Sequence, residues 1–121
     1  MPTPIAITVK VTFTSTENPQ PTWTVSPEPV LVPPGEQTIV WNLDPTSTAG
    51  AKFNPNKGIE QRDPSWPGAN PTRMSDTQWS SPDNNNGGKK RKFIYMINVR
   101  YQGKTYTNRN YPQIENQPMG R

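Results

Sequence analysis

Apolar residues recur at every second position in two long stretches of the chain, residues 5–13 and 93–101. Because the side chains of a β-strand point alternately to its two faces, this period of two predicts two half-buried strands. The apolar face of the first strand carries Ile5, Ile7, Val9, Val11 and Phe13, and that of the second carries Phe93, Tyr95, Ile97, Val99 and Tyr101.

Residues 30–43 predict a strand, a tight turn and a second strand. The first three residues are apolar, and the run ends at Pro33 and Pro34, because proline has no N–H to give to a β-ladder. Gly35 can adopt the positive φ that a turn of this kind needs. Beyond it every second residue is apolar, and Trp41 at the middle of this alternation is expected to pack into the core. The pair forms either a hairpin or a corner.

Residues 44–88 are rich in proline and contain few bulky apolar side chains. The prolines rule out long helices, and an irregular connection of this length is uncommon inside a compact domain. We therefore expect two or three short strands, near residues 51–53, 58–61 and 77–80. The bulky apolar side chains of this segment are Phe53, Ile59, Trp66 and Trp79.

The C-terminal third begins with Asp-Asn-Asn-Asn-Gly-Gly at residues 83–88, a composition that predicts a mobile polar turn. Gln102-Gly103 predicts a two-residue hairpin loop, after which residues 104–107 pair back on the preceding strand. Residues 109–121 are expected to form a tail that is anchored by Tyr111 and Ile114.

About seven short strands, separated by proline and glycine, predict an all-β Greek-key sandwich that occupies residues 1–121 as a single domain. Residues 44–88 form its long Pro-rich connection. An apolar fraction of 29% and 16 prolines favour disorder, but the aromatic and β-branched alternations at both ends favour a folded domain. The pattern fits a cupredoxin-like and an immunoglobulin-like sandwich equally well.

Residues 27–42 resemble a stretch of cupredoxin-like domains, in which an apolar strand and a glycine turn lead to a strand ending in Trp-Asn. More narrowly, roughly two thirds of the chain resembles the DP-EP family, small bacterial proteins of unassigned function with a cupredoxin-like sandwich. The resemblance implies an architecture and brings no catalytic motif. At Tyr111-Pro112 the chain departs from the Asp-Pro of the family pattern. The residues that carry the resemblance are Glu28-Pro29, Asp44-Pro45, 101–106 and 111–116.

The absence of His and Cys excludes several chemistries. A blue-copper centre needs two imidazoles and a thiolate, and the usual zinc sites and His-dependent nucleophiles use the same residues. Most carboxylates lie beside proline or glycine in turns, where acidic side chains usually cap the backbone rather than form a catalytic pair. Residues 83–88 resemble a calcium loop, but Ile94 stands where the bidentate Glu would be required. We therefore expect no enzyme activity, catalytic residue, cofactor or metal.

Positive charge is concentrated near the end of the sequence, where residues 89–121 hold eight basic residues and one acidic residue. One interpretation is a patch that binds nucleic acid or another polyanion through phosphate contacts. The favoured alternative is that the basic run protects residues 93–97, an aggregation-prone apolar window. The residues of the candidate polyanion patch are Lys89, Lys90, Arg91, Lys92, Arg100 and Lys104, and Arg109 adds to their charge.

The sequence favours a non-enzymatic binding or interaction module with an unknown protein partner or ligand, whose contact surface lies in residues 44–88. Trp66 and Trp79 could offer exposed stacking platforms there, but plugs that close the sandwich are favoured, because the small apolar complement needs its aromatics. The chain lacks an apolar run of membrane-spanning length, and its first residues do not resemble a signal peptide. A cytoplasmic monomer, or a homodimer paired through edge strands, is therefore expected.

Overall fold

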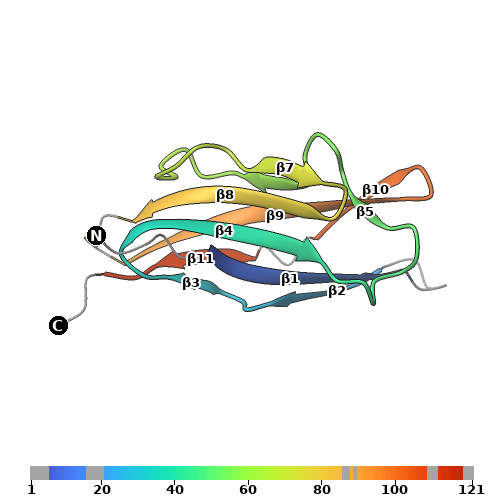
Figure 1. Ribbon diagram of the computed structural model, residues 1–121, viewed down its shortest axis with the longest axis horizontal. Helices are drawn as coiled ribbons and strands as arrows, with labels where there is room; N and C mark the ends of the chain where they lie inside the picture. The colour runs from blue at the N-terminus through green and yellow to red at the C-terminus, as the bar shows by residue number, and fades with distance from the viewer. Residues whose placement is uncertain (1–5, 16–20, 86–87, 89, 109–111, 119–121) are drawn as a thin grey trace.

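The computed structural model describes residues 6–15, 21–85, 88, 90–108 and 112–118, and its strands form two sheets packed face to face (Figure 1). The all-β sandwich that the sequence predicts is confirmed. The described residues form eleven strands, which is more than expected. Several of them are only two to four residues long, too short for an alternating pattern to mark them in the sequence. A helix long and apolar enough to cross a membrane is absent from this described part of the chain.

The first sheet has the strand order β2-β1-β4-β8-β7. Strands β1 and β4 are parallel, and the other neighbours are antiparallel. Between β2 and β4 the chain leaves this sheet and contributes residues 30–32 to the second sheet. The bounds are β1 Ala6–Thr14, β2 Thr22–Ser26, β4 Gly35–Leu43, β7 Thr72–Ser75 and β8 Gln78–Asn85.

The second sheet is built around β9, the longest strand. Strands β11 and β10 pair with successive parts of β9, and β6 and β5 pair with it as well. Strand β3 lies parallel to β11 at the edge of the sheet. The bounds are β3 Val30–Val32, β5 Lys52–Phe53, β6 Ile59–Gln61, β9 Arg91–Tyr101, β10 Lys104–Thr107 and β11 Gln113–Asn116.

The core lies between the sheets and contains the alternating residues that the sequence predicts. Trp41 on β4 is fully buried, and its ring lies 5.3 Å from that of Tyr95 on β9, which joins the two layers. Phe13 on β1 contacts the ring of Tyr106 on β10 at 5.5 Å, farther along the sandwich. The predicted inward faces of the strands are therefore confirmed for the described residues Val9, Val11, Phe13, Ile39, Trp41, Leu43, Phe93, Tyr95, Ile97 and Val99.

Residues 30–43 form a corner between the sheets, because β3 pairs with β11 in the second sheet whereas β4 pairs with β1 and β8 in the first. Gly35, at the start of β4, has a φ of 115°, as the turn chemistry predicts. The predicted hairpin loop is confirmed as well: Gln102 and Gly103 have φ values of 52° and 77°, and β10 pairs back on β9.

Strand β8 corrects the prediction for residues 83–88. The expected strand near residues 77–80 continues to Asn85, so residues 83–85 are strand and not turn. Asn84 donates its N–H to the Pro67 carbonyl at 2.9 Å, on the side away from β4. The nitrogen of Pro82, two residues earlier, faces the same side, so β8 tolerates this proline because no ladder bond with β4 is lost.

Two further strands lie where the sequence predicts only irregular structure. Strand β7 is exposed at all four residues, so no alternation marks it. Strand β11 lies in the predicted tail. The sequence did not indicate it, because one of its two inward positions is the polar Asn116 and only Ile114 is apolar. Ile114 is fully buried, as expected of an anchor. Tyr111 lies outside the described residues.

Buried polar side chains connect the sheets at one end of the sandwich. The Asn116 side chain on β11 donates from Nδ2 to Oδ1 of the fully buried Asp83 on β8 at 2.9 Å. Asn85 donates from Nδ2 to the carbonyls of Val32 and Gln117, both at 2.9 Å. Oδ2 of Asp83 and Oδ1 of Asn116 are buried without a hydrogen-bond partner. Protonation of Asp83 would turn its unpaired acceptor into a donor.

Burial raises the pKa of Asp83 from 3.8 to about 6, although the hydrogen bond from Asn116 opposes the rise. The neutral carboxyl therefore suits the folded protein, so its contribution to stability is complete below pH 3.8 and is lost as the pH rises through 6. The difference between the two pKa values corresponds to about 3 kcal/mol of unfolding free energy.

We predict that Asp83→Asn, which cannot ionise, becomes more stable relative to wild type as the pH rises. The difference in unfolding free energy between variant and wild type should shift by about 3 kcal/mol from about pH 4 to about pH 8. Urea unfolding at several pH values measures this difference. Asp76→Asn is the control, because hydrogen bonding by Arg73 and the charge of Lys52 lower the pKa of the exposed Asp76 below its usual 3.8, so its stability difference should change little above pH 4. A difference for Asp83→Asn that does not change with pH would contradict the prediction.

Gly58 allows a close approach between the middle segment and β8. A Cβ atom at this position would lie 2.5 Å from Nε1 of Trp79 and 2.9 Å from Cβ of Phe53. Both distances are shorter than a van der Waals contact with these buried side chains. We expect Gly58→Ala to lower the unfolding free energy by about 1–3 kcal/mol, because the packed core must move to admit the methyl group. The exposed neighbour Lys57→Ala is the control in urea denaturation, and equal midpoints for the two variants would refute this account.

Candidate functional site

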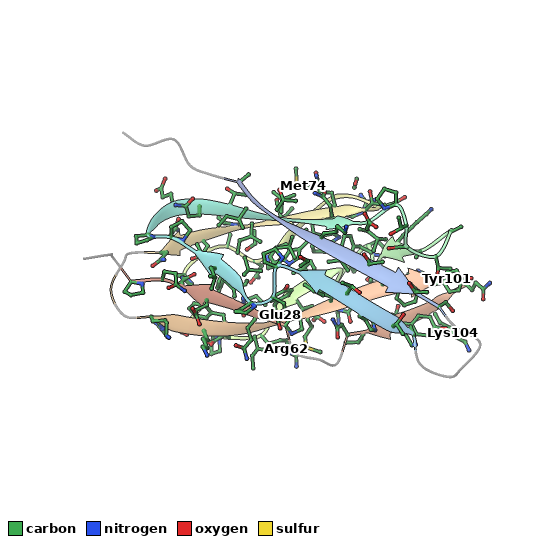
Figure 2. The ribbon with its side chains drawn as sticks, turned by 90° about the horizontal axis from the view of Figure 1, so that it is seen from below. Glu28, Arg62, Met74, Tyr101 and Lys104 are labelled. Atoms are coloured by element: carbon green, nitrogen blue, oxygen red, sulfur yellow. The ribbon has the colours of Figure 1, made fainter. Side chains whose placement is uncertain are left out.

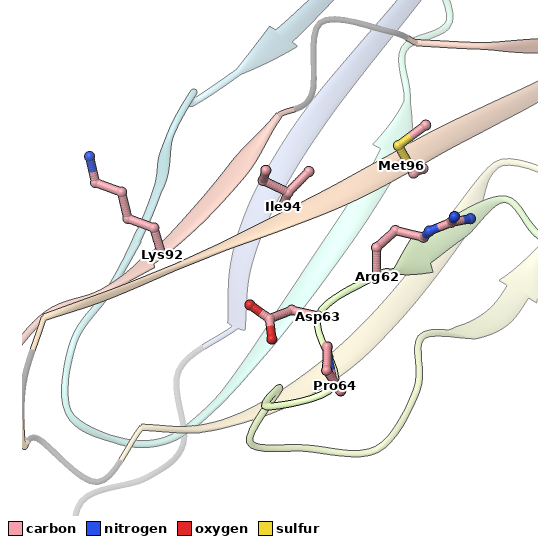
Figure 3. Close-up of a pocket in the computed structure, with 6 residues that line it drawn as sticks. All are labelled: Arg62, Asp63, Pro64, Lys92, Ile94 and Met96. Atoms are coloured by element: carbon pink, nitrogen blue, oxygen red, sulfur yellow. The ribbon is translucent and has the colours of Figure 1, made fainter.

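A groove of about 580 Å³ opens on the outer face of the second sheet, between β9 and the turn that follows β6 (Figure 3). Strand β9 provides its floor, and residues 62–64 provide its wall. The floor arises from the strand period, because the odd-numbered residues of β9 point into the core and the even-numbered ones point outward. The lining residues are Arg62, Asp63, Pro64, Lys92, Ile94 and Met96.

The apolar part of the floor is unusual for the outer face of a sheet. Ile94 is 43% exposed, one of three large apolar side chains that are exposed among the described residues. Met96 lies two residues farther along the same face and also lines the groove. Of the lining residues, Lys92 belongs to the polyanion patch that the sequence predicts. Ile94 and Met96 could also have been recognised from the sequence, because they interrupt the otherwise polar face of the strand.

The wall is a turn held by Asp63. Its N–H donates to Oε1 of Gln61 at 3.0 Å, and its Oδ1 accepts from the Ser65 backbone N–H at 2.9 Å and from Ser65 Oγ at 2.7 Å. The two hydrogen bonds from Ser65, helped by the charge of Arg91, lower the pKa of Asp63. The turn begins at β6, where Gln61 pairs with Tyr95 of β9, so its first end is fixed to the sheet.

The far end of the wall is fixed to β9 by side chains. Arg91 donates from Nη2 to Oγ of Ser65 at 2.8 Å, and its guanidinium lies 5.4 Å from the ring centroid of Phe93. Trp66 meets the same ring edge-on at 5.0 Å. Gly68 packs closely on β8, where a Cβ would lie 2.3 Å from the Pro82 carbonyl oxygen. The groove is therefore built on anchored elements at both ends.

Two cations border the groove and are weakly held. The Arg62 side chain is 64% exposed and lies 3.9 Å from Glu60, and the Lys92 side chain is 58% exposed and lies 3.9 Å from Glu115. Exposed ion pairs of this length contribute about 0–1 kcal/mol, so a ligand can replace them at little cost. The groove thus offers an apolar floor and two exchangeable positive charges.

The structure divides the predicted polyanion patch into two groups. Lys90, Arg91 and Lys92 lie at the start of β9, whereas Arg100 and Lys104 lie at the opposite end, about 26 Å away along the strand. Figure 2 shows Lys104 beside Tyr101 at one end of the sandwich, away from Arg62. Arg100 lines a smaller cavity of about 280 Å³ there. Lys89 and Arg109 lie outside the described residues.

The two tryptophans of the middle segment pack against the core. Trp79 is only 4% exposed, which leaves it no face for a partner. Trp66 is half-buried, and besides its contact with Phe93 it donates from Nε1 to the Ala69 carbonyl at 3.3 Å. Both side chains are thus part of the packed structure, and Trp66 supports the wall of the groove.

The acidic side chains are dispersed. Asp63 is the one carboxylate among the described residues that line the groove, Asp76 is the one in the cavity beside Arg100, and Glu60 is the one in a third cavity of about 220 Å³. In the described parts of the chain, no three acidic residues come together in a way that could hold a metal ion.

No protein-family model matches the chain, and no curated protein sequence matches it. The groove is therefore interpreted from its own geometry, and the resemblance to the DP-EP family stays a prediction from the sequence.

Arg91→Gln should loosen the wall without unfolding the sandwich, because it removes the hydrogen bond to Ser65 and the contact with Phe93. We expect amide hydrogen exchange at Ser65 and Trp66 to become about three- to tenfold faster, as the loss of one hydrogen bond implies. Their N–H groups donate to Asp63, at 2.9 Å and 3.1 Å, and so report on the turn. Arg100→Gln is the matched control; equal exchange in both variants would show that Arg91 does not anchor the wall.

Proposed function

We propose that the protein is a non-enzymatic binding module and that the groove on the outer face of the second sheet is its recognition site. The observation that carries this proposal is an exposed apolar floor, Ile94 and Met96, beside a wall that is anchored at both ends. A preformed site binds with less loss of conformational entropy than a mobile loop does.

The wall supports the expectation that residues 44–88 provide the contact surface. Arg62, Asp63 and Pro64 belong to this segment, and the sheet beneath them is fixed by its pairing with β9. Recognition residues commonly lie on connections that a rigid scaffold positions. The segment therefore contributes to the proposed site through one short turn rather than along its whole length.

The chemistry of the groove favours binding over catalysis. A general acid or base works best when its pKa lies near the operating pH. Hydrogen bonds from Ser65 lower the pKa of Asp63, and they occupy the carboxylate in holding the turn. Asp63 is thus suited to shaping the wall.

The alternative function, binding of nucleic acid or another polyanion, receives less support. Arg91 is engaged with Ser65 and Phe93, and the remaining basic residues of the predicted patch lie at two ends of β9. A backbone of closely spaced phosphates needs a continuous positive surface, which this division interrupts.

The proposal predicts that a displayed library of random peptides will yield ligands that need the groove. Ile94→Thr should weaken selected peptides by about tenfold, because it removes most of an exposed apolar side chain from the floor while keeping a strand-forming residue. Leu31→Thr is the matched control, since Leu31 is 54% exposed on β3 and does not line the groove. Ligands that bind both variants equally, or a library without any ligand, would reject the groove as the recognition site.

A further inference from the structure

The groove has a regular spacing along β9 that matches an extended ligand. Lys92, Ile94 and Met96 occupy alternate positions on the outer face of one strand. At about 3.3 Å per residue, Lys92 and Met96 are about 13 Å apart, and Ile94 lies midway. An extended peptide that lies over this outer face, along the direction of the strand, would present its own alternate side chains at the same spacing.

The two cations lie at opposite ends of this row. Figure 3 shows Lys92 at one end, Ile94 between, and Arg62 next to Met96 at the other end. Along this row the order is therefore positive, apolar, positive, and the carboxylate of Asp63 lies beside the row on the wall. The sequence gives no sign of this order, because Arg62 and Lys92 are 30 positions apart and border one groove only through the pairing of β6 with β9.

The acidic groups around the groove have partners that do not depend on these cations. Oε1 of Glu60 accepts from Nδ2 of Asn98 at 2.9 Å, and Glu115 accepts from Nε2 of Gln117. Asp63 is occupied by Ser65. Arg62 and Lys92 can therefore turn to a ligand without leaving a carboxylate unsatisfied.

We infer that the groove, if it is the recognition site proposed above, binds an extended acidic segment of another protein, in which two carboxylates four residues apart flank a central apolar side chain. The carboxylates would pair with Lys92 and Arg62, and the apolar side chain would lie against Ile94. No five-residue stretch of this chain has an acid at both its first and its last position, so the segment belongs to a different protein. The floor has no aromatic ring on which a nucleobase could stack.

The test uses a capped peptide with the core Asp-Thr-Leu-Thr-Asp, titrated against the full chain by fluorescence anisotropy. Arg62→Gln and Lys92→Gln should each weaken binding about fivefold, the effect of one exposed ion pair. Arg100→Gln and Lys104→Gln remove the same charge outside the groove and should leave binding unchanged. Asn in place of both Asp residues in the peptide, or Ser in place of Leu, should also weaken it.

Three results would overturn the inference. The first is that a peptide of the same composition with adjacent Asp residues binds equally well, and the second is that mixed-sequence DNA competes for the groove at equal charge. The third is that library ligands need Ile94 but lack the spaced acids, which would refute the ligand class and leave the groove as the recognition site. If the peptide binds and none of the groove substitutions changes its affinity, both proposals are refuted.

Discussion

Hydrogen bonding along both edges of β9 is the constraint on which the second sheet depends. Four short strands, β5, β6, β10 and β11, take their register from this one strand, and none of them is long enough to be stable alone. The register fixes which residues of β9 face inward and which face outward. The same pairing therefore places Tyr95 against Trp41 in the core and Ile94 on the floor of the groove.

The groove and the core are connected through Phe93. Its ring is buried in the sandwich, yet Trp66 packs against it edge-on and Arg91 lies over it, and both side chains hold the wall of the groove. The loop that follows Trp66 rests on β8 next to the buried Asp83, through the contact of Gly68 with Pro82. The shape of the groove is thus set by interior packing, which makes it rigid and also sensitive to core substitutions.

The sequence predicted the long alternating strands correctly, because in them every apolar side chain faces the core. The prediction failed where buried side chains are polar or where a strand has no alternation of apolar and polar residues. Asp83 and Asn85 have the composition of a turn but are buried. Strand β11 has a single apolar inward residue, and β7 has none. The site was harder to predict, because only the strand register brings Arg62 and Lys92 to the two ends of one groove. The basic run was visible in the sequence, but the length of β9 separates it from Arg100.

The pairing of β3 with β11 has a consequence for synthesis of the protein in a cell. The Glu28 side chain, just before β3, accepts the N–H of Gln113 at the start of β11, and these residues are 85 positions apart. A ribosome adds roughly 5–20 residues per second, so β3 waits about 4–17 seconds for its neighbour. During that interval the edge of the unfinished sheet is open to other nascent chains, and so is the apolar face of β9 once that strand has been made. The prolines around β3 and the basic residues before Phe93 stand at the places where such chains would otherwise attach.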